Sequence, residues 1–87
     1  MARIILFEGK VTLAGMLVDF RIYRHDDEEV PTYYSFDINP EVRDVNQAGF
    51  HNGATKMAQD LDTLLSRFRN FQGNFSLIAE TRINPDF

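Results

Sequence analysis

Residues 16–38 read MLVDFRIYRHDDEEVPTYYSFDI, and they predict a β-hairpin with a strongly charged loop. On both sides of the loop apolar residues alternate with polar ones, which is the period of a strand with one buried face. Four consecutive carboxylates, Asp26–Glu29, separate the two runs, and like charges this close cannot be buried together. Residues 25–31 are therefore expected to form a solvated loop that joins two strands and closes at Pro31.

Each strand of this hairpin has one face that suits a core. On the first strand, the core face is expected to hold Met16, Val18, Phe20 and Ile22. On the second strand, residues 32–38, the better core face holds Tyr34, Phe36 and Ile38. The opposite face of the second strand then holds Tyr33, Ser35 and Asp37.

Two interpretations of residues 3–24 are open, because glycine interrupts this segment twice. In one, Gly9-Lys10 is the hairpin turn, and residues 11–24 form a long strand that bends at Gly15. In the other, residues 3–13 form one strand with a bulge at Gly9, and the turn falls at Ala14-Gly15. We favour the second interpretation, because the alternation from Met16 onward then stays unbroken.

A helical pattern follows in the second half of the chain. Apolar residues recur there at i, i+3, i+4 and i+7, the spacing of one helix face, and they are Ala54, Met57, Ala58, Leu61, Leu64, Leu65 and Phe68. Asn52 is the expected N-cap, and Gly73 is expected to end the helix.

Two segments flank this helix. Residues 74–83 alternate as a strand, whose inward side chains are expected to be Phe75, Leu77, Ala79 and Ile83. Upstream, Asn39-Pro40-Glu41 has the residue order of a helix start, so residues 40–48 fit either a short helix through Val45 or a plain loop.

The resulting order of strand, strand, strand, helix and strand predicts an α+β fold. A single domain covers residues 1–87, because a chain of this length has no room for a second core. A helix lying on one face of an antiparallel sheet of about four strands buries the apolar faces of both. We therefore expect a small two-layer sandwich whose other sheet face is left to solvent or to a partner.

The composition argues against several kinds of chemistry. The chain has no cysteine, which removes disulfides, thiolate metal sites and cysteine nucleophiles. Neither a serine nucleophile elbow nor a phosphate-binding glycine loop is present. Carboxylates clustered in a solvated loop stay ordinary acids, and these show no calcium-loop pattern. We expect no enzymatic activity, no cofactor and no metal site.

Membranes and nucleic acids are also not expected as direct partners. No segment approaches the roughly 18 apolar residues of a membrane span, and the apolar run after Arg3 is too short for a signal peptide, so a cytoplasmic location is expected. Aromatic and basic residues occur together in residues 20–24, a composition that can bind single strands. The adjacent acidic loop disfavours that function, and it disfavours binding to duplex nucleic acid as well.

The charge of the chain is unevenly distributed. The net charge is −4, but residues 25–44 carry −6 and the remainder carries +2. An acidic region of this kind attracts a basic partner, and tyrosine beside carboxylates suits arginine, which pairs with acids and stacks on rings. The candidate partner-binding residues are Asp26, Asp27, Glu28, Glu29, Tyr33, Tyr34, Asp37, Glu41 and Asp44.

These features predict a small, acidic, non-enzymatic protein that docks on a basic partner protein and inhibits or adapts it. The favoured partner is a nucleic-acid-binding protein, whose basic surface the carboxylates would occupy in place of phosphates. As a class-level analogy, inhibitors made by phages and other mobile elements against host defence and nucleic-acid machinery share this profile. The alternative is a self-associating structural or assembly protein, which would use an unpaired strand edge or the open sheet face.

Overall fold

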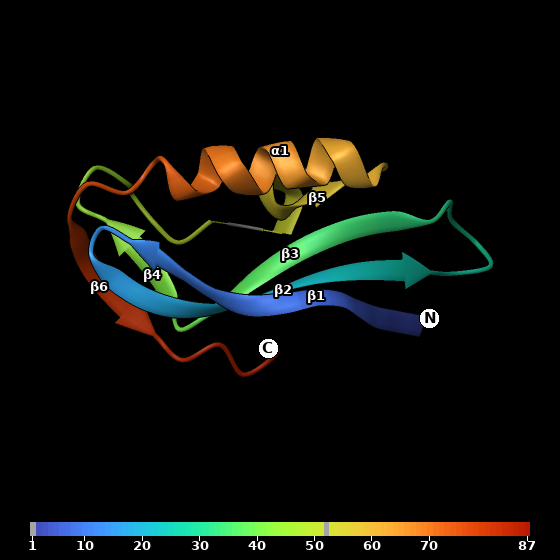
Figure 1. Ribbon diagram of the computed structural model, residues 1–87, viewed down its shortest axis with the longest axis horizontal. Coiled ribbons are helices and arrows are strands. Elements are labelled where there is room, and N and C mark those ends of the chain that lie inside the picture. The colour runs from blue at the N-terminus through green and yellow to red at the C-terminus, as the bar shows by residue number, and fades with distance from the viewer. Residues whose placement is uncertain (1, 52) are drawn as a thin grey trace.

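A four-stranded antiparallel sheet with one helix packed on it forms most of the protein (Figure 1). The structure is a computed structural model that describes residues 2–51 and 53–87. The sheet has the order β1-β2-β3-β5 and is built from β1 (Ala2–Leu13), β2 (Met16–Asp26), β3 (Tyr33–Asn39) and β5 (Met57–Ala58). Helix α1 (Leu61–Gln72) covers one face of it. The predicted small α+β architecture is confirmed.

A second, two-stranded sheet lies at one end of the molecule. It pairs β4 (Glu41–Asp44) with β6 (Ile78–Arg82) in antiparallel fashion. The short helix or loop expected after Pro40 is therefore wrong, because residues 41–44 are extended and bond to the strand that follows the helix. The fourth strand of the main sheet is the two-residue β5, which precedes α1, and a 3-10 turn (Gly53–Lys56) leads into it.

The first hairpin turns at Ala14-Gly15, which confirms the second interpretation of the N-terminal segment. Both residues have positive φ, 49° for Ala14 and 84° for Gly15, as a two-residue turn between twisted strands requires. The bulge lies between Ile5 and Phe7, so the bulge expected at Gly9 is wrong. Gly9 instead pairs with Phe20, whose ring would lie 3.0 Å from a Cβ at position 9.

Replacing Ala14 with asparagine is expected to stabilise the protein by about 0.5–1 kcal/mol. Alanine pays a steric cost at positive φ, whereas asparagine tolerates that conformation. Urea unfolding of Ala14→Asn and of Gly15→Ala measures the effect, and the two free energies should change in opposite directions. A destabilised Ala14→Asn variant would contradict the assigned turn.

The core lies between α1 and the sheet face that it covers. Its buried apolar side chains are Leu13, Val18, Ile22, Phe36, Ile38, Val42, Leu64, Phe68 and Phe71. Phe36 is at its centre, with its ring centroid 4.9 Å from that of Phe68 and 5.0 Å from that of Phe71. Met16, Phe20 and Tyr34 are partly buried against this cluster. The predicted core faces of β2 and β3 are therefore both correct.

Helix α1 begins later than its apolar spacing predicts. Asp60 is the N-cap, and its carboxylate accepts hydrogen bonds from the backbone N–H and the hydroxyl of Thr63 at 2.9 and 2.7 Å. These hydrogen bonds from Thr63 lower the pKa of Asp60. The expected start at Ala54 is therefore wrong, and Asn52 lies outside the described residues. Gly73 ends the helix as predicted.

The strand after the helix is oriented differently from the prediction. Phe75 and Ile78 pack against the core, but Ala79 is exposed, and Leu77 and Ile83 are 63% and 80% exposed. The alternation fails because β6 begins only at Ile78 and pairs with β4 rather than with the main sheet.

The face of the sheet opposite α1 is not fully open. The C-terminal residues run beneath it (Figure 1), and Arg21 Nη1 donates a hydrogen bond to the carbonyl oxygen of Phe87 at 2.7 Å. The Arg21 guanidinium also lies 4.2 Å from the centroid of the Phe87 ring. Further along the tail, Asn84 is buried and donates a hydrogen bond to the carbonyl of Ile38 at 3.0 Å. Part of the face that was expected to meet solvent or a partner is therefore covered by the chain itself.

Candidate docking surface

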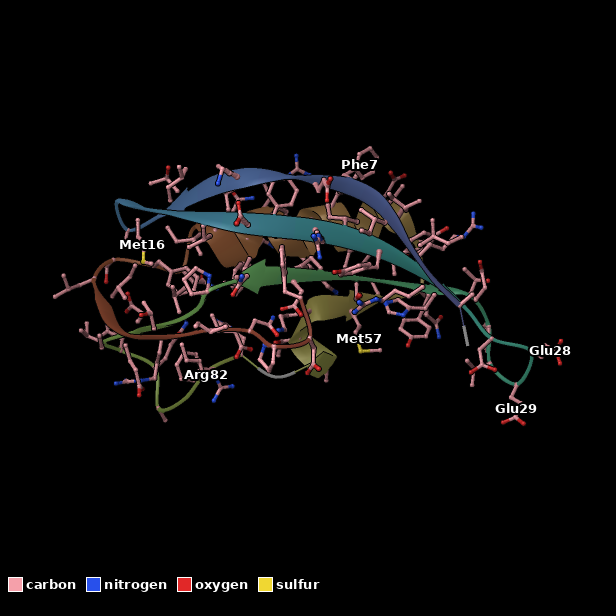
Figure 2. All side chains as sticks on the ribbon, turned by 90° about the horizontal axis from the view of Figure 1, so that it is seen from below. Phe7, Met16, Glu28, Glu29, Met57 and Arg82 are labelled. Carbon is pink, nitrogen blue, oxygen red and sulfur yellow. The ribbon has the colours of Figure 1, made fainter. Side chains whose placement is uncertain are left out.

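The loop between β2 and β3 carries the acidic cluster at the end of the molecule (Figure 2). Asp26 ends β2, and its carboxylate is 3.1 Å from Arg24 Nη2 and accepts a hydrogen bond from the Thr32 hydroxyl at 2.9 Å. The Asp27 carboxylate accepts a hydrogen bond from the backbone N–H of Glu29 at 3.0 Å. Glu28 and Glu29 extend beyond the strands into solvent.

The charges at the tip of this loop have no neutralising partner in the part of the chain that the structure describes. Among residues 2–51 and 53–87, no Lys, Arg or His forms an ion pair with Asp27, Glu28 or Glu29. Asp26 differs, because Arg24 compensates its charge. The tip therefore presents three exposed or half-exposed carboxylates to any partner that approaches.

Tyr33 lies beside this loop on the sheet face opposite α1. Its ring stacks on His25 with a centroid distance of 4.4 Å and an interplanar angle of 1°. His25 Nε2 is also 2.6 Å from Ser35 Oγ, a contact across the β2–β3 pair that the sequence analysis missed. Burial of the ring, with a smaller contribution from the charge of Arg3, lowers the pKa of His25. At neutral pH this histidine is therefore mainly uncharged and does not offset the loop carboxylates.

Tyr34 lies on the other face of β3. Its side chain packs, half-buried, against the core between the sheet and the helix. The alternation of β3 thus separates the two tyrosines that were predicted to bind together. Of the two, only Tyr33 stacks on His25, the residue that precedes Asp26.

Asp37 and Glu41 form an internal ion-pair cluster away from the loop. Lys56 Nζ is 3.1 Å from the Asp37 carboxylate and 3.9 Å from the Glu41 carboxylate, and Arg82 Nε donates to Glu41 at 2.6 Å. Two basic side chains from distant parts of the sequence therefore compensate two of the predicted partner-binding acids.

Asp44 is a structural residue rather than a surface one. It is 1% exposed, and its carboxylate accepts hydrogen bonds from the backbone N–H groups of Ser76, Leu77 and Asn46 at 2.7, 2.8 and 3.1 Å. These bonds, chiefly those from Leu77 and Ser76, lower its pKa. The prediction that Asp44 belongs to a partner-binding surface is wrong, because its charge is used to hold the turn before β6 against the end of β4.

A groove of about 800 Å³ runs beside the acidic loop, between β5 and the start of α1. Its apolar lining comes from Val30, Pro31, Tyr33, Met57 and Ala58. Its polar lining comes from Asp27, Gln59, Asp60, Thr63 and Arg67. Sequence reasoning missed this groove, because residues 57–58 were assigned to the helix rather than to an edge strand.

The groove and the loop share Asp27, so an acidic tip and an apolar depression form one continuous surface. Among the residues that the structure describes, no three His, Asp or Glu side chains are placed to hold a metal ion. In the same residues, no helix has the length and apolar character needed to cross a membrane. Comparisons with protein-family models, with curated proteins and with solved structures find no match to this chain.

Proposed function

We propose that this protein is a non-enzymatic binding protein that docks its acidic loop on a basic surface of a partner protein. The observation that supports this proposal is the contrast among its acids. Asp37, Glu41 and Asp44 are paired or buried within the fold, whereas Asp27, Glu28 and Glu29 have no basic partner among the described residues. Uncompensated charge on an exposed tip is the kind that attracts an oppositely charged surface.

The groove beside the loop provides apolar contact area, which the charges of the loop alone do not provide. Exposed ion pairs contribute little net affinity, because water and salt screen them. Apolar and aromatic side chains that are transferred from water into a pocket contribute most of the binding free energy of an interface. Val30 and Met57 are exposed apolar residues of this groove, and they are placed to receive an apolar or arginine side chain of the partner.

The partner that suits this surface best is a protein that itself binds nucleic acid. Such a protein carries lysine and arginine residues arranged to meet phosphate groups. The carboxylates of the loop are closely spaced along the chain and would occupy those positions. Binding there would inhibit the partner, or would link the partner to another component as an adaptor does. Neither role requires a chemical reaction by this chain.

Reversing two charges at the tip is expected to weaken binding to such a partner by about tenfold or more. The variant Glu28→Lys/Glu29→Lys spares Asp26 and Asp27, whose side chains hold the loop. The matched control is Asp62→Lys/Glu80→Lys, which changes the net charge equally at exposed sites outside the loop.

The measurement uses a panel of purified, basic DNA- and RNA-binding proteins as immobilised probes, at about 50 and about 300 mM salt. We expect binding to at least one probe, weaker binding at the higher salt, displacement of nucleic acid from that probe, and loss of binding only in the loop variant. If no probe is bound, or if the control variant loses as much affinity as the loop variant, the proposal fails.

A further inference from the structure

Strand β1 forms an unpaired edge of the main sheet. Only β2 pairs with it among residues 2–51 and 53–87, so the other side of this 12-residue strand carries unpaired backbone N–H and C=O groups. Three apolar side chains of the strand are exposed: Ile4 at 42%, Ile5 at 46% and Phe7 at 50%. Figure 2 shows Phe7 at this rim of the sheet. A long, exposed, apolar edge is a surface on which another strand can add.

The bulge in β1 determines which side chains share a face. Ile4 pairs with Arg24 and Phe7 pairs with Ile22, two positions of β2 that point toward the helix side. Arg3 pairs with His25 and Glu8 pairs with Arg21, two positions that point to the opposite side. Because Leu6 is an extra residue, side chains three or five positions apart across it lie on the same face.

This distribution of side chains over the two faces makes the edge of β1 complementary to the same edge of a second copy. We propose that β1 pairs in antiparallel fashion with β1 of a second copy of this chain, about a twofold axis between Ile5 and Leu6. In this register Arg3 lies opposite Glu8 of the second copy on one face, and Ile4 lies opposite its Phe7 on the helix side. By symmetry each contact occurs twice, so the dimer contains two apolar pairs and two cross-strand ion pairs, in which Glu8 is shared with Arg21 of its own chain at 3.3 Å.

Neighbouring registers are less favourable. Moving the strand by two residues, with the axis between Leu6 and Phe7, places Arg3 opposite Lys10, and the two positive charges repel each other. An axis at Gly9 pairs Glu8 with Lys10, but it sets Ile5 opposite Leu13, which is buried on the other face. Of the three registers compared, the one centred between Ile5 and Leu6 pairs opposite charges and also sets Ile4 opposite Phe7 on the same face.

The complementary pattern favours a second copy over a strand of a different protein. A strand of an unrelated protein would need charges of opposite sign at the matching positions and a bulge at the level of Leu6. A second copy of β1 in this register has both, because the twofold axis sets each half of the strand opposite the other half. The product is one continuous eight-stranded sheet with both copies of α1 on the same side. The C-terminal residues do not obstruct it, because the tail contacts Arg21 and Arg3 on the face of the sheet rather than on the edge.

The test is the oligomeric state of the wild-type chain and of charge-swap variants, measured by size-exclusion chromatography with light scattering over a concentration series. We expect a dimer whose dissociation constant rises about tenfold in Arg3→Glu and in Glu8→Arg, and returns toward the wild-type value in the double variant. Glu80→Arg, an exposed charge reversal on β6, serves as the control and should leave dimerisation unchanged.

A second measurement does not depend on the folding of any variant. In a mixture of isotope-labelled and unlabelled wild-type chains, isotope-filtered NMR should show contacts between Ile4 of one copy and Phe7 of the other. A chain that stays monomeric up to about 1 mM, or a dimer without these contacts and without rescue by the double variant, would overturn the proposal.

Discussion

Replacing Asp44 with alanine is expected to lower the melting temperature by roughly 10 °C or more. The buried carboxylate accepts hydrogen bonds from three backbone N–H groups, those of Asn46, Ser76 and Leu77. Without it, these three donors lose the acceptor that they share, around a side chain that is only 1% exposed, and donors left without a partner are costly. The contact also ties the end of β4 to the turn before β6, so its loss weakens the whole second sheet.

The effect of this substitution should also depend on pH. Hydrogen bonds from Leu77 and Ser76 lower the pKa of Asp44 in the folded state. Its contribution to stability is therefore fully present above the unfolded value of about 3.9, and it is lost as the pH falls through the lower folded value. Urea unfolding at pH 7 and at a series of acidic pH values should show the gap between wild type and Asp44→Ala narrowing toward acid.

The control for Asp44 is Glu80→Ala, which removes an exposed carboxylate from the neighbouring strand β6. Its effect on stability should be small, because an exposed ion pair contributes little. Equal losses of stability in the two variants would mean that the carboxylate of Asp44 does not have the structural role described above.

Phe36→Ala is the substitution expected to cost the most stability, about 3–5 kcal/mol in the free energy of unfolding. Phe36 is 1% exposed and its ring contacts those of Phe68 and Phe71, so its removal leaves a cavity between the sheet and the helix. In a domain this small, such a loss is comparable with the entire stability. Far-ultraviolet circular dichroism in a urea series measures it.

Two further variants serve as controls for the Phe36→Ala measurement. Phe36→Leu retains most of the apolar volume and should lose much less stability than Phe36→Ala. Leu17→Ala removes an exposed apolar side chain on β2 and should have little effect. If Phe36→Ala unfolds at the same urea concentration as Leu17→Ala, the core cannot be centred on Phe36.

The hairpins could be predicted from the sequence because their signals are local. The alternation from Met16 to Ile22, the Ala14-Gly15 turn and the charged loop each constrain neighbouring residues, and the structure agrees with the first two. The loop is also present, but it spans residues 27–32 rather than 25–31, because His25 and Asp26 pair with β1 as part of β2. The predicted position of the bulge is wrong, because a glycine inside a strand often marks a bulge but Gly9 does not. Gly9 has a different role, since its missing side chain makes room for the ring of Phe20.

The apolar periodicity predicts too early a start for the helix, because it continues upstream of the N-cap residue Asp60. Met57 and Ala58 fit the helical spacing, yet they form the short strand β5. The sequence did contain a usable signal, because Asp60 is a favoured N-cap residue that directly precedes Leu61 and has Thr63 three positions later. A helix that begins after this N-cap excludes residues 57–58, which are then available to pair with β3.

The roles of the acidic residues depend on contacts that no local pattern shows. Asp37 and Glu41 meet Lys56 and Arg82, which lie 15 to 41 positions away in the sequence. Asp44 meets backbone groups more than 30 positions away. A charged side chain is normally assigned to the surface, so these three residues were predicted to be accessible when two are paired and one is buried.

The separation of the acidic loop from the core has a consequence for how this protein can evolve. Glu28 and Glu29 are exposed residues of the loop and are not members of the core cluster, and the stabilising bonds of Asp44 lie at the other sheet. Substitutions at the tip can therefore accumulate at little cost to the fold, because loops of this kind tolerate change better than packed elements do. The two-layer framework can therefore stay the same while the sequence and charge of the loop change.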